Sequence, residues 1–257
     1  MRTKRNAKQE HGPSTKRNHL DKRWIWGRHA VESAMANPNR VILKFLVSGG
    51  IKLENRWQFK PELVDRKEIS ALLPSDAVHQ GFALLAEPLP HLHIEDIIAQ
   101  GGNKSNSTVI ILDQVTDPQN VGAIIRSAAV FQADAVIIQD RNAPPINGTL
   151  AKASSGAIEA VPLVTVTNLS RALEKLKNSG YWCVGLDSEA SESLEMVKPL
   201  PRQAILLGAE GSGLRRLTRE HCDRLCRIDS RGALHSLNVS NAAAIALFAL
   251  TRQEPEN

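Results

Sequence analysis

Residues 206–214 read Leu-Leu-Gly-Ala-Glu-Gly-Ser-Gly-Leu, an apolar run that ends in a glycine-rich turn. The run has the length of a buried strand, and the three glycines let the backbone adopt positive φ and approach a flat ligand closely. Within the turn, the carboxylate of Glu210 can accept hydrogen bonds. An ordinary tight turn explains the glycines equally well. The turn also matches neither of the common nucleotide-binding fingerprints, Gly-x-x-x-x-Gly-Lys-Ser/Thr and a first-strand Gly-x-Gly-x-x-Gly.

Apolar runs of strand length alternate with helical stretches on both sides of this turn. We expect strands over Val109–Leu112, Ala135–Ile138, Val161–Val166, Trp182–Leu186, Ala204–Leu207 and Leu225–Ile228, and helices over Val121–Gln132, Leu169–Asn178, Leu217–Asp223 and Asn241–Leu250. Such alternation predicts a mostly parallel sheet covered by helices on both faces. The expected fold class is therefore α/β.

A smaller α/β unit precedes this pattern. We expect helices over Arg28–Ala36 and Lys67–Leu73, and strands over Val41–Val47 and Phe82–Leu85. Pro88 and Pro90 then interrupt both helix and ladder. The sequence thus predicts a small domain at 24–88, a linker at 89–106 and a large domain at 107–257.

The positive charge of the chain is concentrated at its N-terminus. The 257 residues carry a net charge of +5, of which residues 1–23 carry +6 and the remainder −1. We expect a disordered basic tail at 1–23 that adds salt-dependent affinity for phosphates. A solubilising terminus without a partner and an organelle transit peptide are the alternatives.

Several classes of protein are disfavoured. No stretch approaches the about 18 apolar residues of a membrane span, and the N-terminus lacks a secretory apolar block. Cys183, Cys222 and Cys226 are too few for a disulfide framework, which agrees with a reducing compartment. The grouping of His221 with two of these cysteines lacks the four paired ligands of structural zinc, so we expect no metal. These features predict a cytoplasmic protein.

A second segment with chemical potential covers residues 113–128, Asp-Gln-Val-Thr-Asp-Pro-Gln-Asn-Val-Gly-Ala-Ile-Ile-Arg-Ser-Ala. It leaves a strand, turns at Asp117-Pro118 and enters a helix with Asn120 near its N-cap, the place where ligands of α/β sheets bind. Arg126 lies on the same helix among apolar residues, so we expect its guanidinium to have a partner. A structural ion pair with Asp113 or Asp117 is the alternative to a functional role.

A third segment, residues 228–241, reads Ile-Asp-Ser-Arg-Gly-Ala-Leu-His-Ser-Leu-Asn-Val-Ser-Asn and precedes an apolar helix. Ser236, Asn238, Ser240 and Asn241 place hydroxyls and amides before that helix. For Ser240 or Asn241, N-capping is a better explanation than catalysis.

Together, the three segments resemble the signature motifs of the SpoU (TrmH-like) branch of the SPOUT methyltransferases. The match spans about 108–250 and rests on three patterns: Asp117-Pro118-x-Asn120-x-Gly122-Ala123-x-x-Arg126, Gly208-x-Glu210-Gly211-x-Gly213-Leu214 and Ser236-Leu237-Asn238-Val239-Ser240. The N-terminal part resembles, through a shorter match, the RNA-binding domain of the branch that modifies a guanosine of large-subunit ribosomal RNA. That match rests on Gly27-x-His29-Ala30-Val31 and Ala77-Val78-His79-Gln80-Gly81.

The resemblance implies a C-terminal trefoil knot, a homodimer and S-adenosylmethionine as methyl donor. It implies that the cofactor is held around Leu207, Gly208, Gly211, Ile228 and Leu237. It also implies that the catalytic site contains Asn120, Arg126, Glu210, Ser236 and Asn238.

The function implied is methylation of a ribose 2′-hydroxyl, with ribosomal RNA as the favoured substrate and no DNA or membrane partner expected. A transfer RNA 2′-O-methyltransferase is one alternative, although relatives acting on transfer RNA often lack the small domain. A non-catalytic RNA-binding or ribosome-assembly factor is another, disfavoured by the joint presence of Asn120, Arg126, Glu210 and Asn238. A dinucleotide-dependent oxidoreductase is disfavoured by the missing fingerprint on the first strand.

Overall fold

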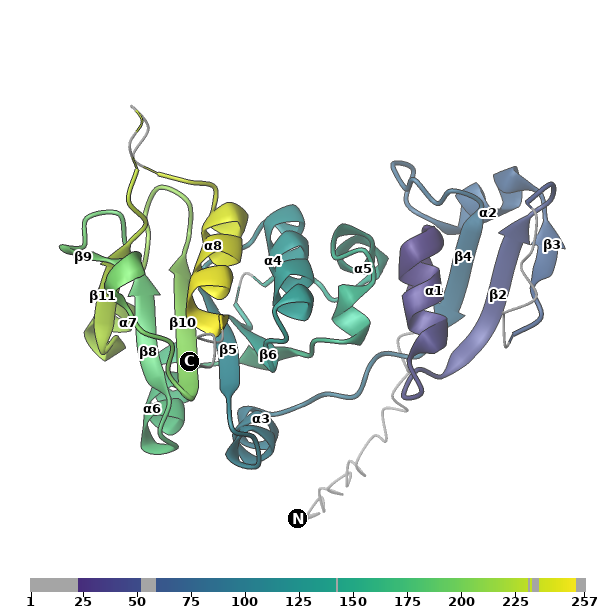
Figure 1. Cartoon of the computed structure of the whole chain (residues 1–257). Helices are drawn as coiled ribbons and strands as arrows, with labels where there is room; N and C mark the ends of the chain where they lie inside the picture. Colours follow the sequence, from purple (N-terminus) through teal and green to yellow (C-terminus); the bar gives the residue numbers. More distant parts are fainter. Residues whose placement is uncertain (1–22, 52–58, 142, 231, 233–235, 253–257) are drawn as a thin grey trace, which may run out of the picture.

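The computed structural model describes residues 23–51, 59–141, 143–230, 232 and 236–252. It contains a four-stranded sheet near the N-terminus and a seven-stranded sheet in the rest of the chain (Figure 1). The basic tail expected at 1–23 lies outside the described residues except for Arg23. That residue opens the first strand and donates to the carbonyl of Ile146, so the last residue assigned to the tail belongs to the small sheet.

The large sheet is parallel throughout, in the order β7-β6-β5-β10-β8-β11-β9. Its strands are β5 (Ser107–Asp113), β6 (Ala135–Gln139), β7 (Leu163–Val166), β8 (Trp182–Leu186), β9 (Glu192–Ser193), β10 (Arg202–Gly208) and β11 (Arg224–Arg227). All seven residues of β5 are buried, as expected for a strand covered on both faces. The predicted α/β class with a parallel sheet is confirmed.

Helices cover both faces of this sheet. They are α3 (Ile94–Gly102), α4 (Pro118–Val130), α5 (Gly148–Ala153), α6 (Leu169–Asn178), α7 (Arg216–His221) and α8 (Val239–Thr251), with short 3-10 turns η1 (Ala157–Glu159) and η2 (Leu194–Met196). One face packs Ile110 of β5 against apolar residues of α4 and α8. The other packs Ile111 of β5 against α3 and α6. In the described parts of the chain, no helix is long and apolar enough to cross a membrane.

The segment 89–106, predicted as a linker, contains α3 over Ile94–Gly102, a helix that the sequence analysis did not predict. Ile94 and Ile97 recur at helical spacing and are buried against the sheet. The helix starts with a capping box at His93 and Asp96. The helical spacing of Ile94 and Ile97 is short, and the prolines before it and the polar residues after it are typical of a linker.

The small unit contains β1 (Arg23–Trp26), α1 (Arg28–Ala36), β2 (Ile42–Ser48), β3 (Glu62–Val64), α2 (Arg66–Leu72) and β4 (Phe82–Ala86). The sheet order is β1-β4-β2-β3, with β4 antiparallel to both of its neighbours. The predicted helix over Arg28–Ala36 is confirmed. The strands β1 and β3 were not predicted, since each is only three or four residues long.

The small unit packs against α5 and η1 of the large unit (Figure 1). Gly148 opens α5 against Trp26, where a Cβ atom would lie 2.1 Å from the indole. Further along this contact, Arg40 makes a bidentate ion pair with Glu159, at 2.6 and 3.1 Å, with side chains only 7% and 4% exposed. Asn37 donates to the same carboxylate at 2.8 Å. These buried contacts fix the two units relative to each other.

Candidate active site

The loops that follow β5 and β10 meet at the carboxyl edge of the large sheet. The two strands are in register, with Gly208 opposite Asp113. After Gly208 the chain turns back on itself, and Gly213 donates to the carbonyl of Ala209 at 2.9 Å. Gly211 and Gly213 have φ of 81° and 65°, a region that favours glycine. A Cβ at Gly208 would lie 2.0 Å from the backbone of Gly213, so the close approach requires glycine there.

A cavity of about 540 Å³ lies at this edge. Its lining includes all the residues expected around the cofactor, namely Leu207, Gly208, Gly211, Ile228 and Leu237. Glu210 and Ser236 line it as well. Sequence reasoning missed the contribution of β8, whose end supplies Asp187, held 2.8 Å from Arg219. A polar residue directly after an apolar strand was the available signal.

Three of the predicted catalytic residues form one hydrogen-bonded cluster beside the cavity. The amide of Asn238 donates to Oε1 of Glu210 at 2.6 Å and to Oδ1 of Asn120 at 3.0 Å. The amide of Asn120 donates to the same Oε1 at 3.2 Å. The cluster joins α4, the loop after β10 and the start of α8, so all three sequence segments converge here.

The helix starts differ in detail from the sequence prediction. Asp117 caps α4, accepting from the backbone N–H of Gln119 at 3.1 Å, which places Asn120 in the first turn. Asn238 caps α8, accepting from the N–H of Ser240 at 2.9 Å, so the prediction of a cap at Ser240 or Asn241 is wrong. The Asn238 amide thus caps a helix through oxygen and holds Glu210 through nitrogen.

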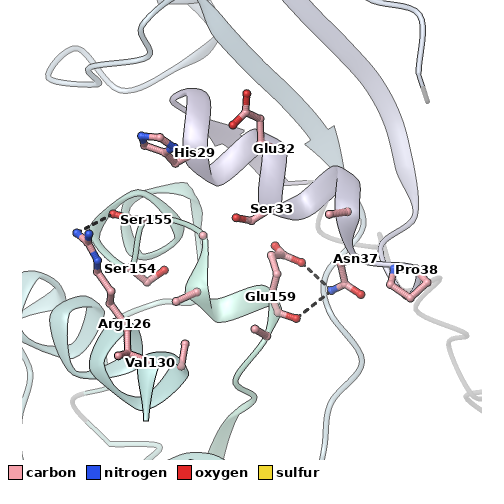
Figure 2. Close-up of a pocket in the computed structure, with 15 residues that line it drawn as sticks. His29, Glu32, Ser33, Asn37, Pro38, Arg126, Val130, Ser154, Ser155 and Glu159 are labelled. Carbon is pink, nitrogen blue, oxygen red and sulfur yellow. Dashed lines mark hydrogen bonds between the residues drawn. The ribbon is translucent and has the colours of Figure 1, made fainter. Parts of the chain in front are cut away.

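Arg126 is not part of this cluster. It lies six residues after Asn120 on α4, about 9 Å further along the axis at 1.5 Å per residue. Its side chain is exposed and donates to Ser155 Oγ at 3.5 Å, in a second cavity beside α1 (Figure 2). The guanidinium has a polar partner, as expected, but the partner is a hydroxyl, because the helix turns the apolar residues toward the sheet and Arg126 away from it.

The alternative ion pair for Arg126 is not formed either. Asp113 is fully buried and pairs with Arg215, whose Nε lies 2.6 Å away and whose backbone N–H donates at 3.0 Å. Arg215 follows the glycine turn directly, so this pair ties the end of β5 to the loop after β10. Sequence reasoning missed Arg215, since nothing local marks it as the partner of a residue 102 positions away.

The cysteines show no sign of reactivity. Burial raises the pKa of Cys183 and Cys222 to about 12 and that of Cys226 to about 11. A thiol must lose its proton to act as nucleophile or metal ligand, so these side chains are packing groups. Within the described ranges, no three residues among His, Cys, Asp and Glu gather in a way that could hold a metal ion.

Two family models match the chain. That of the SpoU rRNA methylase family matches residues 107–248, and that of the RNA 2′-O ribose methyltransferase substrate-binding domain matches residues 24–92. The first match includes the whole large sheet and the three-residue cluster. The second includes the small sheet except for Arg23, the first residue of β1.

Similar proteins agree with these matches. The 23S rRNA (guanosine-2′-O-)-methyltransferase RlmB of Haemophilus influenzae is 37% identical, over 89% of this chain and 97% of its own length. RlmB of Pseudomonas aeruginosa is 38% identical, over 89% and 96%. The crystal structure of the SpoU methyltransferase AviRb from Streptomyces viridochromogenes, in complex with the cofactor AdoMet, has the same fold with a TM-score of 0.75, 21% identity and 93% coverage of both chains. The chain therefore belongs to the SpoU rRNA methylase family.

Proposed function

We propose that this protein transfers a methyl group from S-adenosylmethionine to the 2′-hydroxyl of a ribose in large-subunit ribosomal RNA, on a guanosine. The observation that carries the proposal is the cluster of Asn120, Glu210 and Asn238 beside the cavity at the carboxyl edge of the sheet. The substrate follows from the two RlmB relatives, which align over nearly their whole length, including the small unit.

The cavity fits the cofactor. Its 540 Å³ lie within the about 300–1,000 Å³ typical of small-molecule sites. Apolar side chains at Leu207, Ile228 and Leu237 suit a planar adenine, and the backbone of the glycine turn can approach it closely. Carboxylates at Asp187 and Asp229 line the same cavity and can accept hydrogen bonds from ribose hydroxyls or an ammonium group.

The cluster suits the chemistry of the reaction. When bound, S-adenosylmethionine supplies an electrophilic methyl group. The 2′-hydroxyl is a very weak acid and must lose its proton as it attacks, so the site must stabilise a developing alkoxide. The amides of Asn120 and Asn238 hold Oε1 of Glu210, and Oε2 has no partner among the described residues. We infer that Oε2 accepts the hydrogen bond of the attacking hydroxyl, and that Ser236 lines the same position.

The proposal gives Arg126 the task of neutralising negative charge. An arginine stays protonated in proteins, so it can stabilise the alkoxide or bind a neighbouring phosphate but does not serve as the base. Within one chain its side chain is directed away from the cluster. The positive charge beside Glu210 must therefore come from outside the same chain.

We propose that a homodimer supplies it. Leu237, Ile245 and Phe248 are 49%, 39% and 63% exposed. The face is continuous, because Phe248 of α8 packs edge-on against Phe131 at the end of α4. Exposed apolar faces of this kind mark association sites, and Leu237 and Ile245 also line the cofactor cavity. A second copy on this face would bring its own Arg126 near the cluster.

Phe248→Glu tests the dimer. We expect a monomer by light scattering and loss of methyl transfer, while Leu217→Glu, at an exposed position of α7 beside α6 on the other face of the sheet, leaves both unchanged. A Phe248→Glu protein that is dimeric and active contradicts the proposed interface.

Two further proposals rest on membership of the family. We propose that the methyltransferase domain contains a trefoil knot, which the match to the SpoU rRNA methylase family supports. We propose, as domain organisation, an RNA-binding domain that ends before α3 and a methyltransferase domain that follows, in a protein of the cytoplasm. The RlmB relatives and the two family matches support this reading.

The deciding experiment is transfer of labelled methyl to unmodified ribosomal and transfer RNA. We expect label on ribosomal RNA, resistant to alkaline cleavage at one nucleotide, and its loss in Arg126→Ala. Arg216→Ala is the matched control, since that exposed arginine pairs with Glu220 one helical turn away. Label on transfer RNA alone would show that the substrate is transfer RNA rather than ribosomal RNA. Binding without transfer to either RNA would favour a non-catalytic assembly factor.

A further inference from the structure

A second cavity, of about 870 Å³, separates the small unit from the large one. Its walls are α1 with residues 37–38 on one side, and α4 with residues 154–160 on the other (Figure 2). It shares no described lining residue with the cofactor cavity. We call it the interdomain groove.

One end of the groove is basic. Arg126 and His29 lie at this end, from opposite walls, and both side chains are exposed (Figure 2). Lys152 lies outside the groove lining, beside the start of α1, where its Nζ donates to Oε1 of Gln80 at 2.9 Å. Gln80 also accepts from the N–H of Arg28 at 3.2 Å. No carboxylate lies within ion-pair distance of Arg126, His29 or Lys152 in the part of the chain that the structure describes.

The acidic residues of the groove are already paired. Glu159 is held by Arg40 and Asn37 at the other end, and Glu32 makes an ion pair with Arg28 at 3.0 Å. Their charges are thus largely compensated. The groove therefore presents uncompensated positive charge at one end and neutral polar groups elsewhere, which suits an anion.

The floor of the groove suits a flat apolar group. It is formed by small aliphatic side chains, namely Ala36, Ala129, Val130, Ala157 and Ala160. Hydroxyls at Ser33 and Ser155 lie between this floor and the basic end. A nucleotide combines these features, with a planar base and a phosphate on opposite sides of a hydroxylated sugar.

The groove is also preformed. The buried ion pair of Arg40 with Glu159 and the packing of Gly148 on Trp26 join the two walls. Gly156, with φ of 85°, brings the lower wall so close that a Cβ would lie 2.4 Å from Ser33 Oγ. A ligand therefore meets walls that are already ordered, which lowers the entropy cost of binding.

We propose that the interdomain groove binds an unpaired stretch of the RNA substrate next to the methylated nucleotide. A phosphate lies on Arg126 and His29, and a base lies on the aliphatic floor. The proposal rests on the proposed function for the identity of the RNA. In this proposal His29 binds RNA. Arg126 lies away from the cofactor cavity of its own chain because it binds the substrate in the groove.

Two variants test the groove from its two ends. His29→Ala removes an imidazole donor, with His91→Ala as control at an exposed histidine outside the groove. Ala36→Trp fills the aliphatic floor, with Ala71→Trp as control at an exposed alanine of α2. Each protein is measured for methyl transfer to a large-subunit ribosomal RNA transcript, for affinity to that transcript by anisotropy, and for S-adenosylmethionine affinity by calorimetry.

We expect both groove variants to raise KM for the transcript and to weaken its binding by about tenfold. A change of this size corresponds to the loss of one charge-assisted hydrogen bond or a similar contact. Cofactor affinity and the control variants stay at wild-type values. Unchanged KM and anisotropy in both groove variants overturn the proposal while leaving the proposed function intact. So does a defect confined to assembled ribosomal particles, which would indicate a protein partner. If the wild-type protein transfers no methyl group, the proposed function is overturned. The anisotropy comparison then tests, independently of activity, whether the groove binds RNA.

Discussion

Asn238 and Glu210 are joined by a 2.6 Å hydrogen bond from Nδ2 to Oε1, which fixes the start of α8 against the loop after β10. The same asparagine caps α8 through its oxygen. The position of the Glu210 carboxylate is thus tied to the formation of a helix rather than to a flexible contact.

Replacing Glu210 tests this carboxylate. Glu210→Gln keeps an oxygen that can accept from both asparagine amides but removes the charge. We expect the rate of methyl transfer to fall on the order of 10²-fold, the usual loss when a positioned acid–base group is removed. S-Adenosylmethionine affinity, measured by calorimetry, should change little. Glu220→Gln, at an exposed carboxylate paired with Arg216, serves as control, and an equal loss there would contradict the role of Glu210.

Gly208→Ala tests the turn. The new Cβ would lie 2.0 Å from Gly213 C and 2.3 Å from Gly213 O, and backbone atoms cannot rotate away as a side chain can. We expect cofactor affinity by calorimetry to fall at least about tenfold, or about 1.4 kcal/mol, while affinity for RNA is kept. Gly102→Ala is the control, since a Cβ there meets nothing within 4 Å. Normal cofactor binding by Gly208→Ala would show that the turn can open without cost.

The contact between the two units can be tested through Arg40 and Glu159. Arg40→Met leaves the Glu159 carboxylate buried and without its ion pair, which we expect to cost about 3–5 kcal/mol in the free energy of unfolding by urea. Arg40→Met combined with Glu159→Leu should recover much of that loss, because no buried charge remains. Lys44→Met breaks the exposed pair with Glu62 and should cost at most about 1 kcal/mol. Equal costs for the two single variants would contradict the burial argument.

His79 makes stability depend on pH. Desolvation, together with the nearby charge of Arg66, lowers the pKa of His79 below its ordinary value of 6.5. Its Nδ1 accepts from the N–H of Gly81 at 3.1 Å, an arrangement that requires the neutral ring. Because the unfolded chain binds the proton more readily, this contribution is fully present above about pH 6.5 and is lost as the pH falls through the lower folded pKa.

The measurement for His79 is the free energy of unfolding at about pH 8 and about pH 5.5. We expect wild type to lose more stability than His79→Gln over this interval, because glutamine does not titrate. Parallel losses in the two proteins would assign the pH dependence to other groups.

Local sequence patterns were sufficient to predict the α/β class, most of the large-sheet strands and the three segments that carry the site. Apolar runs, helix caps and glycine turns act over a few residues, so they can be recognised locally. The cofactor-lining positions followed from the motif resemblance for the same reason. Helix α3 was also encoded locally, in the spacing of Ile94 and Ile97, but was overlooked beside the prolines.

Which side chains meet depends on the tertiary packing. Asn120, Glu210 and Asn238 come together because two parallel strands place their carboxyl ends side by side and α8 returns to that edge. The separation of Arg126 from them, and its position opposite His29, depends on the rotation of α4 and on how the small unit packs against α5 and η1. These relationships rest on contacts between residues far apart in the chain, and no local pattern specifies such contacts.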